Sequence, residues 1–182
     1  MHSSTSFSSL VLVLASLFPA LAKAQASPAV PSPDGLYVGF GLGQDLGGLY
    51  GVGISYWPAP WLSGFVGGGW AVVDFSYQTG LQFRLPTEKR VSPFLAAMYG
   101  YNGAIHIKGK ESLDGIYYGP TVGGGIILKQ RSGHNYWRFS INVPMRSQEF
   151  LDDWEAIKQR PDVEVKADLL PVTIGVGFHL KL

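Results

Sequence analysis

Large apolar residues alternate with small or polar residues through most of the chain, most clearly in 172–182. Every second position of that stretch is apolar, and the positions between them hold Thr, Gly, His or Lys. Because successive side chains of a β-strand point to opposite faces, the pattern predicts a strand with one apolar and one polar face. The stretch is about as long as a tilted membrane-crossing strand needs to be.

The same alternation recurs in seven other stretches, which are separated by turns rich in Pro, Gly and Asp. Together the stretches predict eight strands, at about 36–42, 49–57, 61–72, 75–85, 91–107, 116–128, 136–143 and 172–182. The period shifts near Asn102 and Gly103, which indicates a β-bulge in the fifth strand. Short outer turns are expected near Asp45 and Asp74.

One stretch between the last two strands has helical rather than strand periodicity. Phe150, Trp154 and Ile157 fall on one helical face, and Ser147 precedes them as a suitable N-cap. We therefore expect a short amphipathic helix in the last outer loop. Its apolar face is the candidate contact site for a ligand or partner. The face could instead cap the barrel mouth or lie in the membrane interface.

The polar faces of the predicted strands are rich in glycine, which decides between two all-β folds. A narrow eight-stranded barrel is filled by its own side chains, so glycine relieves crowding there, whereas glycine on a solvated face only weakens a strand. Aromatic residues near the strand ends resemble interfacial girdles. The predicted fold is an eight-stranded antiparallel transmembrane β-barrel over 34–182. A soluble exported lipocalin-like binder, with its apolar faces inside, is the alternative fold.

Composition and the first segment agree with export. Charged residues make up 15% of the chain, the formal net charge is +1, and there is no Cys. A disulfide framework and a thiolate metal site are thereby excluded, and no nucleic-acid partner is expected. The apolar run 10–18 and the small-x-small sites after it predict a signal peptide at 1–24 and a linker at 25–33. The expected location is the cell outer membrane.

Polar side chains expected to face the barrel interior form a candidate network. Its members are Gln78, Gln82, Arg84, Arg138, Asn142 and His179. Because buried polar groups must be paired, we expect a hydrogen-bonded filling rather than a solute path. No cofactor or metal ion is expected, since the histidines lack closely spaced ligand partners. In the last strand, a polar residue at Val176 should impair insertion, while a small residue at Gly175 should matter less.

Four stretches resemble small eight-stranded outer-membrane β-barrel proteins of Gram-negative bacteria, most of all the "outer membrane protein beta-barrel domain" sequences of the Bacteroidota. The stretches are 93–102, 117–121, 142–147 and 172–182. The resemblance implies an integral envelope protein with a structural, adhesive or partner-binding role and no catalysis. It also implies contact with outer-membrane lipid and lipopolysaccharide, and insertion by the barrel-assembly machinery. The chain departs from the pattern at Leu182, where such proteins often end in an aromatic residue.

A second function comes from the likeness of some eight-stranded barrels to lipid A-modifying enzymes, which use His with Ser or Asp near the outer rim. Of the histidines after the signal peptide, only His106 is expected at the height of the outer leaflet. Ser76 and Ser140 are possible nucleophiles on the inner face. A catalytic pair must lie within hydrogen-bond reach, so this alternative depends on the three-dimensional arrangement.

Overall fold

The structure, a computed structural model, describes residues 33–107, 114–132, 134–161, 163 and 169–182. The predicted signal peptide at 1–24 and nearly all of the predicted linker lie outside the described residues.

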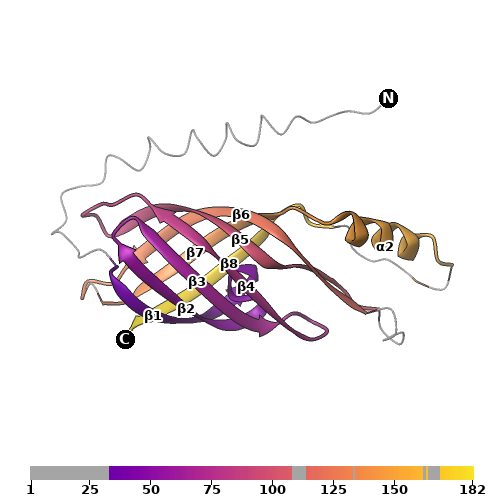
Figure 1. The fold of residues 1–182 in the computed structure, drawn as a ribbon, viewed down its shortest axis with the longest axis horizontal. Helices are drawn as coiled ribbons and strands as arrows, with labels where there is room; N and C mark the ends of the chain where they lie inside the picture. The colour runs from indigo at the N-terminus through magenta and orange to yellow at the C-terminus, as the bar shows by residue number, and fades with distance from the viewer. Residues whose placement is uncertain (1–32, 108–113, 133, 162, 164–168) are drawn as a thin grey trace, which may run out of the picture.

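Eight strands form one closed antiparallel barrel in which each strand pairs with the next and β8 pairs with β1 (Figure 1). The strands are β1 (Gly35–Gly43), β2 (Gly48–Ala59), β3 (Leu62–Trp70), β4 (Phe75–Arg84), β5 (Val91–Ile105), β6 (Gly115–Lys129), β7 (Tyr136–Pro144) and β8 (Thr173–Lys181). A 3-10 helix, η2 (Gln44–Leu46), follows β1, and an α-helix, α2 (Gln148–Lys158), lies between β7 and β8. The predicted fold and the predicted helix in the last loop are confirmed.

The register of β8 against β1 closes the barrel. Val38 pairs with Leu180 and Phe40 with Phe178, so both apolar faces point the same way across the seam. The Phe40 and Phe178 rings contact each other edge to face, with centroids 5.8 Å apart. The pairing of the last strand with the first leaves neither strand with an open edge there, as the alternation in 172–182 required.

Apolar side chains cover the outside of the barrel, and polar side chains together with a buried aromatic cluster fill its inside. On β4, Leu81 is 50% exposed while its neighbour Gln82 is 3% exposed. On β7, Ile141 is 54% exposed while Asn142 is fully buried. Because the two faces alternate with period two along each strand, one apolar band surrounds a polar interior. This arrangement is the reverse of the one in a soluble barrel.

The two ends of the barrel differ. Short connections join β2 to β3, β4 to β5 and β6 to β7 at the end where the C-terminus lies, which we call the turn end. At the opposite end, the loop end, β5 and β6 continue as a hairpin beyond their neighbours. Pairing of β4 with β5 stops at Gly100, whereas β5 and β6 pair as far as Ile105 with Gly115. Figure 1 shows that this hairpin and α2 extend beyond the same end.

A β-bulge lies in β5 where the sequence predicted one. The register of β5 against β6 shifts between Tyr101 and Gly103. Before the bulge the even-numbered residues Phe94, Ala96 and Met98 are buried, and after it the odd-numbered Ile105 is buried. The extra residue, Asn102, therefore changes the inward-facing positions of β5 from even-numbered to odd-numbered ones.

Candidate functional site

The first loop does not stay outside the barrel as a turn but folds into its interior. Gln44, Asp45 and Leu46 of η2 are each at most 3% exposed. Gly43 and Gly47 flank the helix with φ values of +118° and +87°, a conformation that glycine adopts without steric cost. The Gly47 N–H donates to the Gln44 carbonyl at 2.9 Å and closes the turn. The connection near Asp45 is short, as predicted, but its predicted place outside the barrel is wrong. We call residues 44–46 the plug.

Gln44 fixes the plug to three strands through its side-chain amide. Its Nε2 donates to the Tyr101 carbonyl at 2.7 Å and to Thr121 Oγ1 at 2.8 Å. Its Oε1 accepts a hydrogen bond of 2.8 Å from the Thr173 hydroxyl. Three hydrogen bonds of the Gln44 amide thus join the plug to β5, β6 and β8, and they hold it in one orientation.

Asp45 carries the negative charge of the interior and faces β7. Its Oδ2 lies 3.0 Å from Arg138 Nη1, and both side chains are at most 3% exposed. Ser140 donates to the same oxygen at 3.2 Å, and the Asn142 amide donates to Ser140 at 3.4 Å. The Arg138 guanidinium also lies 4.9 Å from the Phe94 ring centroid. A buried cation requires such a partner, because an isolated charge in a dry interior is very costly.

Glycines on the neighbouring strands make room for the plug. A Cβ at Gly67 would lie 3.1 Å from Leu46 Cα, and a Cβ at Gly175 would overlap the Asp45 carboxylate. The expectation that a small residue at Gly175 should matter less than a polar residue at Val176 stays a prediction, but the overlap shows that Gly175 is a crowded position. The inward glycines of β1, β2, β3 and β8 face the plug, whereas β4 and β7 contribute long polar side chains. The plug therefore fills the side of the interior that the strands themselves leave empty.

Aromatic and cationic side chains fill the turn end of the interior. His179 stacks on Tyr136 with ring centroids 4.5 Å apart and an interplanar angle of 9°. The Tyr136 hydroxyl accepts from Trp57 Nε1 at 3.4 Å. Arg84 lies 4.9 Å from the Trp57 ring and donates through Nε to the Pro60 carbonyl at 2.9 Å. Arg84, like Arg138 beside Phe94, thus lies against an aromatic ring, which attracts the cation electrostatically.

All six residues of the predicted polar network lie in the barrel interior. Gln78, Gln82, Arg84, Arg138, Asn142 and His179 are each at most 5% exposed. They divide into two groups, however. Arg138 and Asn142 belong to the plug side, and Arg84 and His179 to the turn-end aromatic group. A cavity between the groups, lined in part by Asp45, Gln82 and His179, measures about 10 Å³, roughly the space of one water molecule.

The apolar face of α2 packs against the projecting β5–β6 hairpin. Phe150 and Ile157 are 2% and 8% exposed and form a cluster with Ile105, which we call the loop-end core. Tyr117 and Phe150 meet edge to face at 4.9 Å, and the Tyr117 hydroxyl donates to Asp153 Oδ2 at 2.6 Å. Ser147 caps the helix by accepting the Phe150 N–H at 3.2 Å, as predicted. Two of the three predicted contact residues are thus already covered by the chain itself, and Trp154 is the one that remains partly accessible.

Arg146 ties the loop-end core to the barrel. Its Nη1 donates to the Asn102 carbonyl at 3.0 Å, and its Nη2 donates to the Leu170 carbonyl at 3.1 Å. Its guanidinium lies 4.7 Å from the Phe150 ring. One side chain therefore joins the bulge of β5, the helix and the segment that leads into β8.

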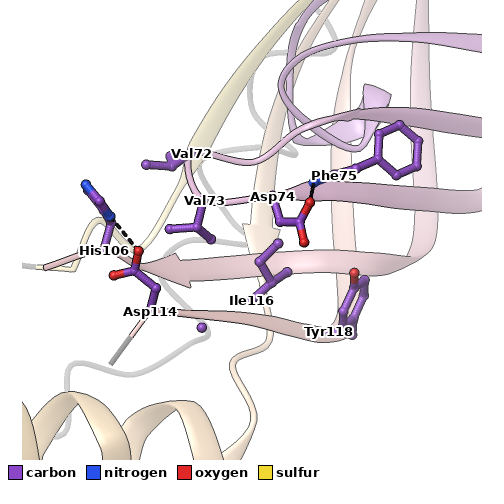
Figure 2. A pocket seen from close by; sticks show the side chains of 9 residues that line it. Val72, Val73, Asp74, Phe75, His106, Asp114, Ile116 and Tyr118 are labelled. Atoms are coloured by element: carbon purple, nitrogen blue, oxygen red, sulfur yellow. Dashed lines mark hydrogen bonds and ion pairs between the residues drawn. The ribbon is translucent and has the colours of Figure 1, made fainter. Parts of the chain in front are cut away.

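A cleft of about 620 Å³ lies on the outward side of the projecting hairpin, beside the β3–β4 turn (Figure 2). We call it the rim cleft; it is lined by Val72, Val73, Asp74, Phe75, His106, Asp114, Gly115, Ile116 and Tyr118. The turn is tight, with the Ala71 N–H donating to the Asp74 carbonyl at 2.9 Å and with Val72 at φ +72°. A β-branched residue is rarely found in that conformation.

The side chains of His106 and Asp114 lie within ion-pair distance of each other at the far end of the rim cleft. His106 Nδ1 lies 2.9 Å from Asp114 Oδ2, and the Ile107 N–H donates to Asp114 Oδ1 at 2.9 Å. The backbone hydrogen bond from Ile107, with the hydrogen bond from His106 second, holds the pKa of Asp114 below its ordinary value. Both carboxylate oxygens are thus engaged in holding the two ends of the β5–β6 loop together.

The residues proposed for lipid A chemistry are not brought together. Ser140 donates to Asp45, and the Ser76 hydroxyl bonds the Gly47 carbonyl, so both hydroxyls are committed inside the barrel. His106 lies outside the interior, in the rim cleft. In the described part of the chain, no three His, Cys, Asp or Glu side chains are grouped as a metal site would require. Nor does any helix of that part have the length and apolar character needed to cross a membrane.

The plug, Asp114 and Tyr117 are the parts that sequence reasoning missed. A signal for the plug was present: Arg138 was predicted to face the interior, while no predicted inward residue was acidic. An acid from a loop was therefore needed, and the glycines of β1, β2, β3 and β8 indicated where it would enter. No comparable signal pointed to Tyr117, since its inward position depends on strand length beyond the barrel.

Comparison with known proteins adds two structural likenesses. No protein-family model and no curated protein matches the chain. A designed protein described as "De novo design of transmembrane beta-barrels" aligns with a TM-score of 0.47 and 16% identity, over 87% of this chain and 100% of the other. The N-terminal β-barrel domain of Pseudomonas aeruginosa OprF aligns with a TM-score of 0.43 and 14% identity, over 80% and 96%. The assignment of the fold rests on the strand register itself.

Proposed function

We propose that the chain is an integral outer-membrane β-barrel with a structural, adhesive or partner-binding role in the bacterial envelope. The observation that carries the proposal is the band of exposed apolar side chains around a polar, filled interior. Exposed fractions of 61% for Val52, 59% for Leu95 and 72% for Ile174 would be unfavourable in water. A closed barrel also satisfies its backbone hydrogen bonds internally, which a membrane-spanning structure must do.

The loop end supports a surface role rather than transport. The plug and the aromatic turn end fill the interior, so we expect a barrel that does not conduct. The projecting β5–β6 hairpin and α2 form a second packed unit beyond the barrel, held by Arg146 and the loop-end core. In our proposal this unit faces outward from the cell and offers the surface for a partner. Outer-membrane lipid and lipopolysaccharide surround the barrel, and the assembly machinery inserts it. A relationship to the Bacteroidota barrels stays a prediction.

Fractionation of a Gram-negative host that expresses the full chain tests the proposal. We expect the protein in the outer-membrane fraction, with faster gel migration before heating than after it. Val176→Arg should impair insertion, because a cation on the lipid face costs about 2–4 kcal/mol near the bilayer midplane. Val176→Leu is the matched control and should insert normally. Recovery of the unmodified protein from the soluble periplasm, without heat-dependent migration, would favour the lipocalin-like alternative.

Two further measurements separate a structural barrel from the other functions. Mass spectrometry of lipid A from cells with and without the protein should give the same profile. A change in acyl-chain number would instead support the lipid A-modifying alternative. Reconstituted protein in a planar bilayer should show no steady conductance, whereas regular single-channel steps would contradict a filled interior.

A further inference from the structure

A groove of about 550 Å³ lies on the outer face of β1, β2 and β3, toward the loop end of the barrel. We call it the outer groove. Large exposed side chains form its walls, and glycine backbone forms part of its floor. The wall residues are Phe40, Leu42, Tyr50, Val52, Trp70 and Phe75. None of the described residues that line the groove is charged, so it suits an apolar molecule.

Gly68 creates the groove because it is the outward-facing residue of β3 at this level. In the register of the sheet, Gly68 lies between Val52 of β2 and Tyr77 of β4, whose large side chains are both exposed. One side chain is therefore missing from an otherwise continuous outward row. A Cβ on Gly68 would lie 2.6 Å from the tip of the Phe75 ring, so this ring leans over the glycine from the β4 side.

The plug does not account for this glycine. The neighbouring Gly67 and Gly69 face the interior, where a Cβ on either would approach the backbone of Leu46. Gly68 faces the other way, is partly exposed and lines the groove. A glycine inside a strand costs stability, and it often marks a place where a ligand approaches the backbone. The position of Gly68 therefore indicates a ligand on the outside of the barrel.

The surroundings of the groove indicate which ligand this is. The apolar band continues past the groove on both sides, to Phe178 beyond Phe40 and to Tyr77 beyond Gly68. The backbones of β1, β2 and β3 are hydrogen-bonded to each other here, so they cannot pair with a peptide strand. A charged headgroup finds no partner in the lining. Within the membrane, the molecules in contact with this band are lipid acyl chains.

Two aromatic residues set the direction of the chain. Tyr50 and Trp70 are paired across β2 and β3 at the loop-end side of the groove. Rings with a polar tip favour the level of the lipid headgroups. Val52 and Phe40, paired across β1 and β2, lie further from that end. A chain whose headgroup is at the level of Tyr50 and Trp70 would therefore run along Val52 and Phe40 toward the middle of the membrane.

We propose that the outer groove binds one acyl chain of a membrane lipid from the leaflet at the loop end, and that it selects the chain rather than the headgroup. The chain lies over Gly68, between Val52 and Phe75. Since the surrounding lipid is equally apolar, the preference comes from van der Waals contacts on several sides of the chain rather than from the hydrophobic effect. This inference rests on the proposed membrane insertion and adds a lipid site to it.

Nanodiscs that hold one barrel each test the site with the full chain, after heat-dependent gel migration has confirmed folding. The lipid is phosphatidylcholine, a small fraction of which carries a photoactivatable diazirine in its acyl chain. After irradiation, mass spectrometry gives the amount of label at each residue. Val52 and Ile141 have similar exposed fractions, 61% and 54%, but of these two only Val52 lines the groove. Because a chain in the groove makes several additional contacts, we expect roughly threefold more label at Val52.

A substitution of Gly68 examines the cause of the excess label. Gly68→Leu fills the groove and should lower the label at Val52 to the level at Ile141. The barrel should still fold, because the exposed Phe75 ring can turn away from the new side chain. Gly64→Leu is the matched control and should keep the excess label. Gly64 faces outward on the same strand but does not line the groove, and an added Cβ there makes only ordinary van der Waals contact.

A second substitution tests the site if Gly68→Leu does not fold. Val52→Trp fills the groove from the β2 side, and the label is then read at Trp70, where it should fall. Val66→Trp, on the exposed face of β3 but outside the groove, is its control and should leave the label at Trp70 unchanged.

Changing the lipid tests the selection of the chain. Photoactivatable phosphatidylglycerol and phosphatidylethanolamine with the same acyl chain should give the same excess at Val52. An excess with only one headgroup, label in proportion to exposure in the parent chain, or an excess that survives filling of the groove would overturn the proposal. So would pairs of barrels in larger nanodiscs that lose the label at Val52, because a second copy would then fill the groove. Failure of the parent chain to enter nanodiscs would instead count against membrane insertion itself, so the two failures are distinguishable.

Discussion

Asp45 Oδ2 lies 3.0 Å from Arg138 Nη1 inside the barrel, and these two side chains come from the first loop and the seventh strand. The ion pair joins the plug to the wall that faces it. Since both groups are almost completely buried, each depends on the other for neutralisation. The pair therefore decides whether the first loop stays inside.

The effects of replacing the two members of this pair on the free energy of unfolding should be coupled. Asp45→Asn leaves the Arg138 charge buried without its partner and should lower the free energy of unfolding by about 3 kcal/mol. The double variant Asp45→Asn/Arg138→Gln should lose clearly less than the sum of the single losses. Urea unfolding of the refolded barrel, followed by tryptophan fluorescence, measures both. Strictly additive losses would show that the two side chains do not interact.

The space beside Asp45 gives a second prediction. Gly175→Ala places a methyl group where the Asp45 carboxylate and the Ser140 hydroxyl now lie, so we expect a loss of about 1–3 kcal/mol through overpacking. Gly177→Ala is the matched control on the same strand. Its added Cβ would lie 3.2 Å from His179 Nε2 and 3.6 Å from Leu46 Cδ1, which a small adjustment relieves. Unfolding midpoints of the two variants should differ, and equal midpoints would contradict the packing of the plug against β8.

A substitution that weakens the loop-end core should not prevent the barrel from forming. Phe150→Ala removes the ring that contacts Tyr117 and should lower the local stability of the α2 segment by about 3 kcal/mol. Leu151→Ala, at a position that is 37% exposed, should have little effect. Limited trypsin digestion should cleave Phe150→Ala faster at Lys158, while heat-dependent migration is unchanged. If the whole barrel fails to form, the helix is part of the barrel's own folding unit.

The hydrogen bonds of Asp114 predict that the local structure at the rim cleft becomes less stable at acidic pH. The pKa of Asp114 is held below its ordinary value, first by the Ile107 N–H and then by His106. The stabilisation is therefore fully present above the ordinary pKa of Asp and is lost as the pH falls through the lowered value. The protection of the Ile107 amide from hydrogen exchange, relative to its intrinsic exchange rate at each pH, should fall over that acidic range. Asp114→Asn should remove most of this pH dependence, and an unchanged profile would contradict the assignment.

The strand pattern was predictable because an apolar outer face around a filled interior imposes period-two alternation on every strand. Leu81 beside Gln82 and Ile141 beside Asn142 could be placed on their faces from sequence alone, and so could the bulge near Asn102. The plug was missed, because residues 44–46 resemble an ordinary turn and only the lack of an acidic partner for the inward Arg138 pointed to it. Its direction is set by charge and space contributed by β7 and β8, about a hundred residues away. The rim cleft depends on unequal strand lengths, which alternation does not encode.

The bulge in β5 has a consequence for how this chain can change. Ile105 lies in the loop-end core and the next residue, His106, lies in the rim cleft, only because one extra residue precedes them. Deleting a single residue at the bulge would turn Ile105 outward and His106 toward α2, while the barrel below kept its register. The packing of Ile105 against α2 and the contact of His106 with Asp114 would then be lost in one step. These two features can be inherited or lost only together, so the length of this segment is constrained more strictly than its composition.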